Sequence, residues 1–344
     1  MYLSSRNTLR TAVLVGLALC LAGTTAPRAQ QQAVAQVWPV GWTPAFEQTN
    51  PGTMVLTNRP SEAGIILPID KVEFAKKPGP KGNEQHTVYL VGGPRLEVDR
   101  GAYTTPNPKL REKFYLQWRI WPPNNTTMTE AHWHRELRTE AFVFGDAYWH
   151  GSGPVVDQKR RTHQYQGDFL VEEAGGHHFG WTDPNTHENT VFFIFGSEPE
   201  ADRPVGSEVP AEKHNSFYPK DKIQWQPGQG TGPMTFNMVG DATKAGYYNE
   251  INKWRPGNAL NARIYSNDRY GMVVSGRIYI GWGDKMDPKK GHLMTQGTFF
   301  SQPAGMSVFM YVPTGEQEDA VVIMYGKGPS QFKAIESAPT TTER

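Results

Sequence analysis

Two histidines stand at alternate positions in the stretch AHWHRELRTEAFVFG, residues 131–145. Side chains of a β-strand alternate between its two faces, so His132 and His134 are expected to point the same way. Two imidazoles side by side on a buried face are costly unless they share a proton, a carboxylate or a metal ion. The spacing therefore indicates a polar site, and a metal ion explains it most directly.

A third histidine follows a glycine-rich turn further along the chain. In EAGGHHFGW, residues 173–181, His177 and His178 stand at the start of a predicted strand. Glycine allows the turn to bring one of them close to His132 and His134. We expect His178 to be that residue, and we interpret His177, which alternates to the other face, as a turn or pocket residue. Three converging imidazoles with an open side suit Fe, Cu, Zn, Ni or Mn and leave positions for water or substrate.

The elements that must position these side chains are predicted to be strands. Short alternating runs such as 114–120, 190–195 and 320–325 are separated by glycine turns, and long helical periodicity is absent. The 35 glycines and the 12% aromatic residues suit a β-rich chain with many turns. The pattern is typical of an all-β sandwich or barrel.

The chain also contains an internal repeat. The phrase GDFLVEEAGGHHFGW from Gly167 matches GTFFSQPAGMSVFMY from Gly297, 130 residues later. At the same offset, the positions of His132, His134 and His178 are occupied by Ala262, Ile264 and Val308. The sequence predicts two tandem copies of one β-domain, of which only the first has kept the histidines.

These phrases resemble the two cupin motifs, His-x-His followed by a glycine, and Gly-x5-Pro-x-Gly-x2-His. The first is carried by His132 and His134 leading to Gly145, and the second by Gly167 leading to Gly175 and His178; Glu173 stands where the proline is usual. The resemblance implies two tandem cupin domains, each a double-stranded β-helix or jelly roll, with metal ligands only in the first. It also implies an activity similar to that of quercetin or gentisate dioxygenases.

The resemblance implies a fourth ligand as well, usually a glutamate five residues after the second histidine. That position is Thr139, and Glu140 comes one residue later. If the loop has gained one residue, Glu140, Phe142 and Phe144 face inward and Glu140 completes the site. If Thr139 keeps the inward position, the site has three histidines and Glu140 points away. The large residues at 142 and 144 favour the first alternative, and an unligated Glu140 or His150 is the candidate general acid or base.

Three neutral imidazoles leave a divalent ion its full positive charge, so it can bind an oxygen-chelating organic molecule. We therefore expect an exported metal-dependent oxidoreductase, dioxygenase-like, with Fe(II) slightly ahead of Cu, Mn, Ni or Zn. The alternatives are a non-redox isomerase, decarboxylase or lyase, and a small-molecule-binding cupin without catalysis.

The start of the chain predicts export. Arg6 and Arg10 precede a short apolar run, as in a secretory signal peptide, with cleavage after Ala35 or Ala29. The single cysteine, Cys20, lies in this segment, so the mature chain is expected to have no disulfide. The predicted organisation is a signal peptide (1–35), an N-terminal arm (36–100), a metal-binding cupin domain (101–200), a linker (201–220), a degenerate cupin domain (221–332) and a flexible tail (333–344).

The charge pattern limits the partners. A formal net charge of +1 without a basic stripe argues against nucleic acid. We expect a periplasmic or secreted protein with a small-molecule substrate, no membrane contact after signal removal, and a possible homodimer, because cupin sheets commonly pair at their edges.

Overall fold

The computed structural model describes residues 43–50, 52–58, 60, 63–73, 85–93, 112–123, 129–198, 202–204 and 215–335. The predicted signal peptide and both cleavage positions lie outside the described residues, as do parts of the predicted arm and linker and residues 336–344 of the tail. Within the described part of the chain, no helix has the length and apolar character needed to cross a membrane.

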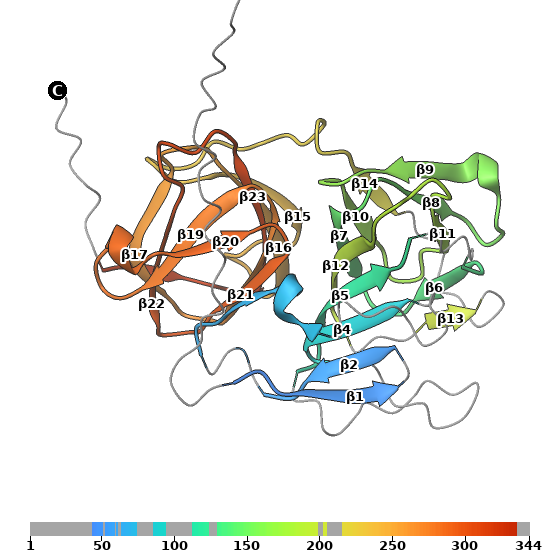
Figure 1. Ribbon diagram of the computed structural model, residues 1–344, viewed down its shortest axis with the longest axis horizontal. Coiled ribbons are helices and arrows are strands. Elements are labelled where there is room, and N and C mark those ends of the chain that lie inside the picture. The colour runs from blue at the N-terminus through green and yellow to red at the C-terminus, as the bar shows by residue number, and fades with distance from the viewer. Residues whose placement is uncertain are drawn as a thin grey trace, which may run out of the picture. The chain divides into compact units, whose positions relative to one another are not determined.

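The first barrel is built from two sheets (Figure 1). The larger sheet has the strand order β1(Phe46–Asn50), β2(Thr53–Leu56), β4(His86–Val91), β5(Tyr115–Trp121), β12(Thr190–Gly196), β7(Arg138–Phe144), β10(Phe169–Glu172) and β14(Ser216–Tyr218). The smaller sheet has the order β13(Asp202–Pro204), β6(His132–His134), β11(His178–Thr182), β8(Tyr148–Ser152) and β9(Arg161–Gln164). All of the pairings described in these two sheets are antiparallel except that of β2 with β4.

The second barrel repeats this plan, in orange to red in Figure 1. Its larger sheet has the order β15(Met234–Val239), β16(Gly246–Trp254), β23(Ala320–Gly328), β18(Arg269–Ser275), β21(Thr298–Gln302) and β3(Ile66–Pro68). Its smaller sheet has the order β20(His292–Thr295), β19(Arg277–Trp282), β22(Ser307–Tyr311), β17(Ala259–Tyr265) and β24(Phe332–Ala334). Short 3₁₀ turns lie at η2(Ile69–Lys71), η3(Gln158–Arg160) and η4(Pro288–Lys290). The all-β expectation is confirmed.

Two predicted connecting segments contribute strands to these sheets. β3, in the predicted arm, pairs with β21 of the second barrel, whereas β1, β2 and β4 extend the larger sheet of the first. β14, at the end of the predicted linker, pairs with β10 of the first barrel. These short segments outside the predicted domains therefore pair with edge strands of the barrels. The pairing satisfies backbone hydrogen-bonding groups that would otherwise be unpaired at those edges.

Alternate residues of the strands in the larger sheet contribute to two different hydrophobic clusters, one on each face of the sheet. Tyr115, Phe142 and Phe192 pack in a cluster on the inner face of the first barrel, and their neighbours Leu116, Val143 and Phe193 belong to a larger cluster on the opposite faces. Because both faces of the larger sheet are covered, a strand such as β12 is buried along its whole length. This explains the unbroken apolar run at 191–195.

The ladders correct the register of the repeat. His178 lies opposite His132 in the first barrel, and Val308 lies opposite Arg263 in the second. The residue that corresponds to His132 is therefore Arg263, not Ala262, and by strand alternation Tyr265 rather than Ile264 corresponds to His134. The cause lies after β17, because 46 residues separate His132 from His178 and 45 separate Arg263 from Val308. The difference arises in the turn after β18, where Ser275 and Tyr279 are four residues apart and the matching Phe144 and Trp149 are five. Val308 keeps its predicted correspondence with His178.

Candidate metal centre

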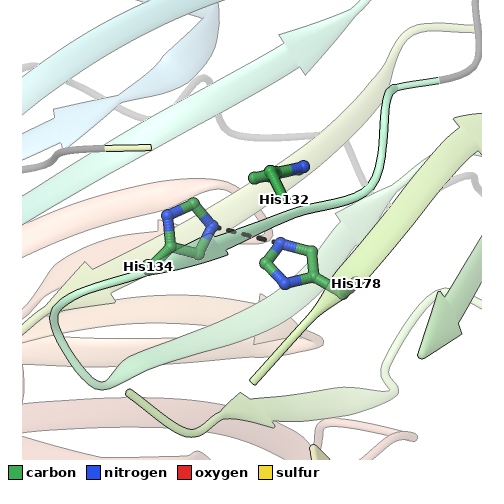
Figure 2. Close-up of side chains that lie close together, drawn as sticks. All are labelled: His132, His134 and His178. Atoms are coloured by element: carbon green, nitrogen blue, oxygen red, sulfur yellow. Dashed lines mark hydrogen bonds between the residues drawn. The ribbon is translucent and has the colours of Figure 1, made fainter. Parts of the chain in front are cut away.

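Two neighbouring strands bring the three predicted histidines together. His132 and His134 form the two ends of β6, and His178 begins β11, directly opposite His132. The ring centroids lie 4.3 Å apart for His132 and His178, 4.7 Å for His134 and His178, and 5.1 Å for His132 and His134. Figure 2 shows the rings of His134 and His178 turned toward each other with His132 beside them. The predicted convergence of these side chains is therefore present in the structure.

Hydrogen bonds fix which nitrogen of each ring faces the centre. The Nδ1 atoms of His132 and His178 lie 2.8 and 3.1 Å from the carbonyl oxygens of Glu130 and Gly176. A carbonyl only accepts, so each Nδ1 donates a proton and each Nε2 keeps a lone pair. The Nε2 of His134 accepts from Nη1 of Arg138 at 2.5 Å, so it has a lone pair too. His132 and His178 thus offer Nε2 as a ligand atom, whereas the Nε2 lone pair of His134 is engaged by Arg138 and would bind a metal only if the guanidinium moved aside.

A glutamate that the sequence analysis did not identify lies beside the three histidines. Glu172, the last residue of β10, is buried, and its carboxylate lies 3.3 Å from Nε2 of His178 and 3.6 Å from Nε2 of His134. It also accepts a hydrogen bond from Nε2 of His150 at 3.3 Å. The signal that could have found it is strand alternation: Glu172 is a charged residue on the inner face of the otherwise apolar run FLVE.

The donor set fits a bound cation. The Nε2 atoms of His134 and His178 lie 3.1 Å apart, and both lie within 3.6 Å of the Glu172 carboxylate, so three electron-rich groups crowd one buried space. Such an arrangement is repulsive without a positive charge between the atoms. Metal–nitrogen bonds of ~2.0–2.1 Å would hold two such nitrogens roughly 2.9–3.4 Å apart. His132, His134 and His178 also form one group with all ligand atoms within 4.8 Å, and His150, Glu172 and His178 form a second.

A buried arginine holds the carboxylate side of the centre. Arg138 is 1% exposed, and its Nη1 atom lies 3.4 Å from Glu172 and 4.0 Å from Glu140. Its Nε donates to the hydroxyl of Tyr115 at 2.9 Å, and that hydroxyl donates to Glu136 at 3.3 Å. The guanidinium of Arg138 therefore lies beside two buried carboxylates, those of Glu140 and Glu172, and is linked to a third, that of Glu136, through Tyr115. The excess of negative charge also favours a cation.

The electrostatics set the protonation states that a metal requires. Burial lowers the pKa of His178 well below its ordinary value, so the ring is neutral at neutral pH. Burial by itself raises the pKa of the Glu172 carboxyl. Its interaction with the His178 ring, the hydrogen bond from His150 and the charge of Arg138 outweigh burial and hold this pKa well below its usual range. Neutral His178 and anionic Glu172 are the forms that coordinate metals.

The register of β7 decides between the two alternatives for the fourth position. Thr139 faces away from the histidines, because its Oγ1 accepts a hydrogen bond from Nδ2 of Asn249 at 2.5 Å. Arg138, Glu140 and Phe142 face inward; Phe144 does not follow them and packs against the larger core cluster. The Thr139 alternative is therefore wrong. Glu140 lines the cavity but belongs to neither group of converging ligand atoms, so its role as a ligand stays a prediction.

The remaining predicted residue, His150, lies beside the centre on β8. Its ring stacks near that of His178, with centroids 5.4 Å apart and an interplanar angle of 18°. Because the Glu172 carboxylate accepts from it, Nε2 of His150 carries a proton and can supply one. His177 is buried but lies outside both ligand groups, as its alternation predicts.

A cavity of about 450 Å³ opens onto this centre, within the range of small-molecule sites. Its lining has a polar part, which includes His132, His150 and His178 with Arg119, Arg138, Glu140 and Glu172, and an aromatic wall. The aromatic wall consists of Trp121, Tyr148 and Phe192. The cavity can therefore hold a molecule with oxygen atoms on one side and an apolar surface on the other.

Comparison with known proteins gives structural likenesses only. No protein-family model matches the chain, and no curated protein matches it. Similar solved structures include oxalate decarboxylase of Lactobacillus farciminis in a formate complex (12% identity, 64% of this chain and 79% of that chain, TM-score 0.41), salicylate 1,2-dioxygenase of Pseudaminobacter salicylatoxidans (12%, 64% and 74%, 0.45) and protein Ylba of E. coli (11%, 77% and 90%, 0.48).

These neighbours have the cupin fold. The likeness concerns the arrangement of strands and not the reaction.

Proposed function

We propose that the first barrel holds one divalent transition metal through Nε2 of His132, His134 and His178, with the Glu172 carboxylate as the fourth protein ligand. The observation that carries this proposal is the crowding of three electron-rich groups in one buried space, with Nε2 of His134 and His178 only 3.1 Å apart and both within 3.6 Å of the Glu172 carboxylate. Hydrogen bonds from Nδ1 to backbone carbonyls orient His132 and His178, as is usual for metal-binding imidazoles.

The proposed activity is an oxidoreductase reaction of the dioxygenase-like kind on a small organic substrate that chelates through oxygen. A bound Fe(II), which we place slightly ahead of Cu, Mn, Ni and Zn, would supply redox chemistry and bind the substrate oxygens. The chain's own residues orient and protect the site. Arg138 holds Glu172 in its anionic form, and His150 can donate a proton from Nε2.

A second candidate is a non-redox isomerase, decarboxylase or lyase. The hydrogen-bonded pair of His150 and Glu172 favours it, because such a pair next to a bound carbonyl compound can carry a proton to or from carbon. Both candidates need the same metal centre, and they differ in whether oxygen is consumed.

Metal content tests the centre. The purified protein is expected to contain one equivalent of metal, and His134→Ala is expected to lose it. His163→Ala is the matched control, because His163 stacks on Trp149 on the outer face of the same sheet at 3.8 Å. Less than one equivalent in the native protein, or an unchanged content in His134→Ala, would refute the proposal.

Oxygen uptake separates the two reaction classes. A panel of 1,3-diketones, catechols and flavonols is expected to include a compound whose turnover consumes oxygen. Turnover without oxygen consumption would rule out the dioxygenase-like reaction and favour the non-redox candidate. We also propose that the protein works after export, in keeping with the predicted signal peptide.

A further inference from the structure

The hydroxyl of Tyr148 is a hydrogen-bond donor without a protein partner on the cavity wall. Tyr148 is buried, lines the cavity and packs its ring against Phe192 at 4.9 Å and Trp121 at 6.0 Å. None of the described residues forms a hydrogen bond with its hydroxyl. Buried tyrosine hydroxyls ordinarily have a partner, so this donor is available to a ligand.

Gly180 provides the space that this hydroxyl occupies. Gly180 lies on β11 opposite His150, and a Cβ atom there would overlap the Tyr148 hydroxyl and lie 2.8 Å from Cε1 and Cζ of its ring. Tyr148, His150, His178 and Gly180 share the inner face of the smaller sheet, because Tyr148 and His150 are two residues apart on β8 and His178 and Gly180 on β11. The hydroxyl is thus placed on the same inner face as the metal centre.

The second barrel shows what these positions contain where there is no such site. The ladders place Ile278, Ile280 and Met310 at the positions of Tyr148, His150 and Gly180. All three pack in the apolar cluster inside that barrel. Tyr148 and Gly180 therefore occur in the barrel that has the three histidines and are replaced in the other. This is expected for residues that contact a bound molecule and are not required by the fold.

We propose that Tyr148 is a specificity-determining residue whose hydroxyl donates a hydrogen bond to an anionic oxygen of the molecule held at His132, His134 and His178. This inference rests on the proposed metal centre. The ring of Tyr148 belongs to the aromatic wall, so the ligand that suits it has a planar apolar part and an oxygen-bearing edge, as in a phenolate or an enolate.

The surroundings keep the hydroxyl in its donating form. Burial, followed by the negative charge of Glu140, raises the pKa of Tyr148 far above its ordinary value. The side chain is therefore a neutral donor throughout the working pH range and is not a general base.

The test uses the intact protein loaded with Zn(II) and 4-nitrocatechol as the probe, whose visible absorption reports binding to a metal. Tyr148→Phe is expected to weaken probe binding about tenfold, the contribution of one hydrogen bond of roughly 1.4 kcal/mol, and to keep one equivalent of zinc. Tyr279→Phe is the matched control, because Tyr279 stacks on Tyr311 in the second barrel. Gly180→Ala keeps the hydroxyl but displaces it, and is expected to weaken binding as well.

The outcomes are distinguishable. One equivalent of zinc with equal probe affinity in native protein and Tyr148→Phe would overturn the role of Tyr148 and leave the metal centre standing. Zinc-loaded native protein that does not bind 4-nitrocatechol would overturn the inferred ligand class. Native protein that takes up less than one equivalent of zinc would refute the metal centre and this inference together.

Discussion

Both barrels bury an arginine at the same point of the fold, but they surround it differently. Arg138 lies opposite Glu172 in the ladder of β7 and β10, and Arg269 lies opposite Gln302 in the ladder of β18 and β21. Each arginine also touches the residue at the second histidine position. Arg138 donates to His134, and the guanidinium of Arg269 lies 4.1 Å from the ring of Tyr265.

The two barrels share the arginine and its tyrosine neighbour, and they differ in the position of the carboxylate. A buried guanidinium with a tyrosine on the strand β5 or β16 occurs in both barrels, as the pairs of Arg138 with Tyr115 and Arg269 with Tyr248. The carboxylate partner has changed strands, however: in the second barrel Arg269 binds Glu250 of β16 at 2.9 Å. The arginine therefore belongs to the barrel, and the position of the carboxylate decides whether it meets the imidazoles.

The largest expected effect comes from removing either arginine. Arg138→Met removes the guanidinium beside the buried Glu172, at a cost of about 3–5 kcal/mol in the free energy of unfolding, and Arg269→Met removes the guanidinium beside the half-buried Glu250. Zinc is expected to reduce the cost for Arg138→Met, because the ion offers Glu172 another positive charge, and to leave the cost for Arg269→Met unchanged. Urea denaturation with and without zinc measures this, and equal zinc dependence in the two variants would contradict the comparison.

His178→Val places in the first barrel the residue type that Val308 provides at the corresponding position of the second. We expect zinc affinity to fall at least about 100-fold, because one of three imidazole ligands is lost. The reverse change, Val308→His, is the matched control and is expected to create no second site, since Arg263 and Tyr265 occupy the other two positions. Competition with a chromophoric chelator measures both; tight zinc binding by His178→Val would count against the proposed ligand set.

Glu172→Gln copies Gln302 and tests the ligand that the sequence analysis missed. The side chain keeps its size but loses its charge, so zinc affinity is expected to fall roughly 10–100-fold, with at least part of the histidine site retained. Glu250→Gln, which removes the corresponding carboxylate in the second barrel, should leave zinc affinity unchanged. Equal affinity in Glu172→Gln and the native protein would show that Glu172 is not a ligand.

The smallest effect is a pH dependence of the metal-free protein. The pKa of His178 is lowered in the folded state, so the unfolded chain binds a proton at higher pH than the folded chain does. Its contribution to stability is present above the ordinary histidine pKa near ~6.5 and is lost as pH falls below it, by up to about 1.4 kcal/mol per pH unit. His178→Val should lack this part of the slope. Parallel stability profiles of the two proteins between pH 7 and 5 would contradict the assignment.

The sequence was sufficient to predict the strand-rich fold, the repeat and the three converging histidines. Those features depend on local alternation and on a glycine turn, and both patterns are visible in a single chain. The one-residue difference between the turn after β7 and the turn after β18 was not visible, because it changes no composition or periodicity signal, and it moves the counterparts of His132 and His134 to Arg263 and Tyr265. The correspondence between the two repeats is therefore established only by the pairing of their strands.

The carboxylate was missed for a related reason. The cupin motif predicts the fourth ligand on β7, at Thr139 or Glu140, whereas the converging carboxylate comes from β10. Arg138 and Glu172 are 34 residues apart but directly paired across two strands. A linear motif specifies spacing along one strand and does not describe a ligand that has moved to the neighbouring strand.

The strand that carries His178 differs from the strand that carries the other two histidines in how firmly it is held. β11 is paired along its whole length with β8, whereas β6 has three residues, meets β11 at a single pair and has only the short strand β13 on its other side. Local opening of a sheet begins where few backbone hydrogen bonds must break. Hydrogen exchange of the backbone amide is thus expected to be slow at His178 and faster at His132 and His134. A bound metal ion would then dissociate at a rate set by local opening of β6 rather than by unfolding of the barrel.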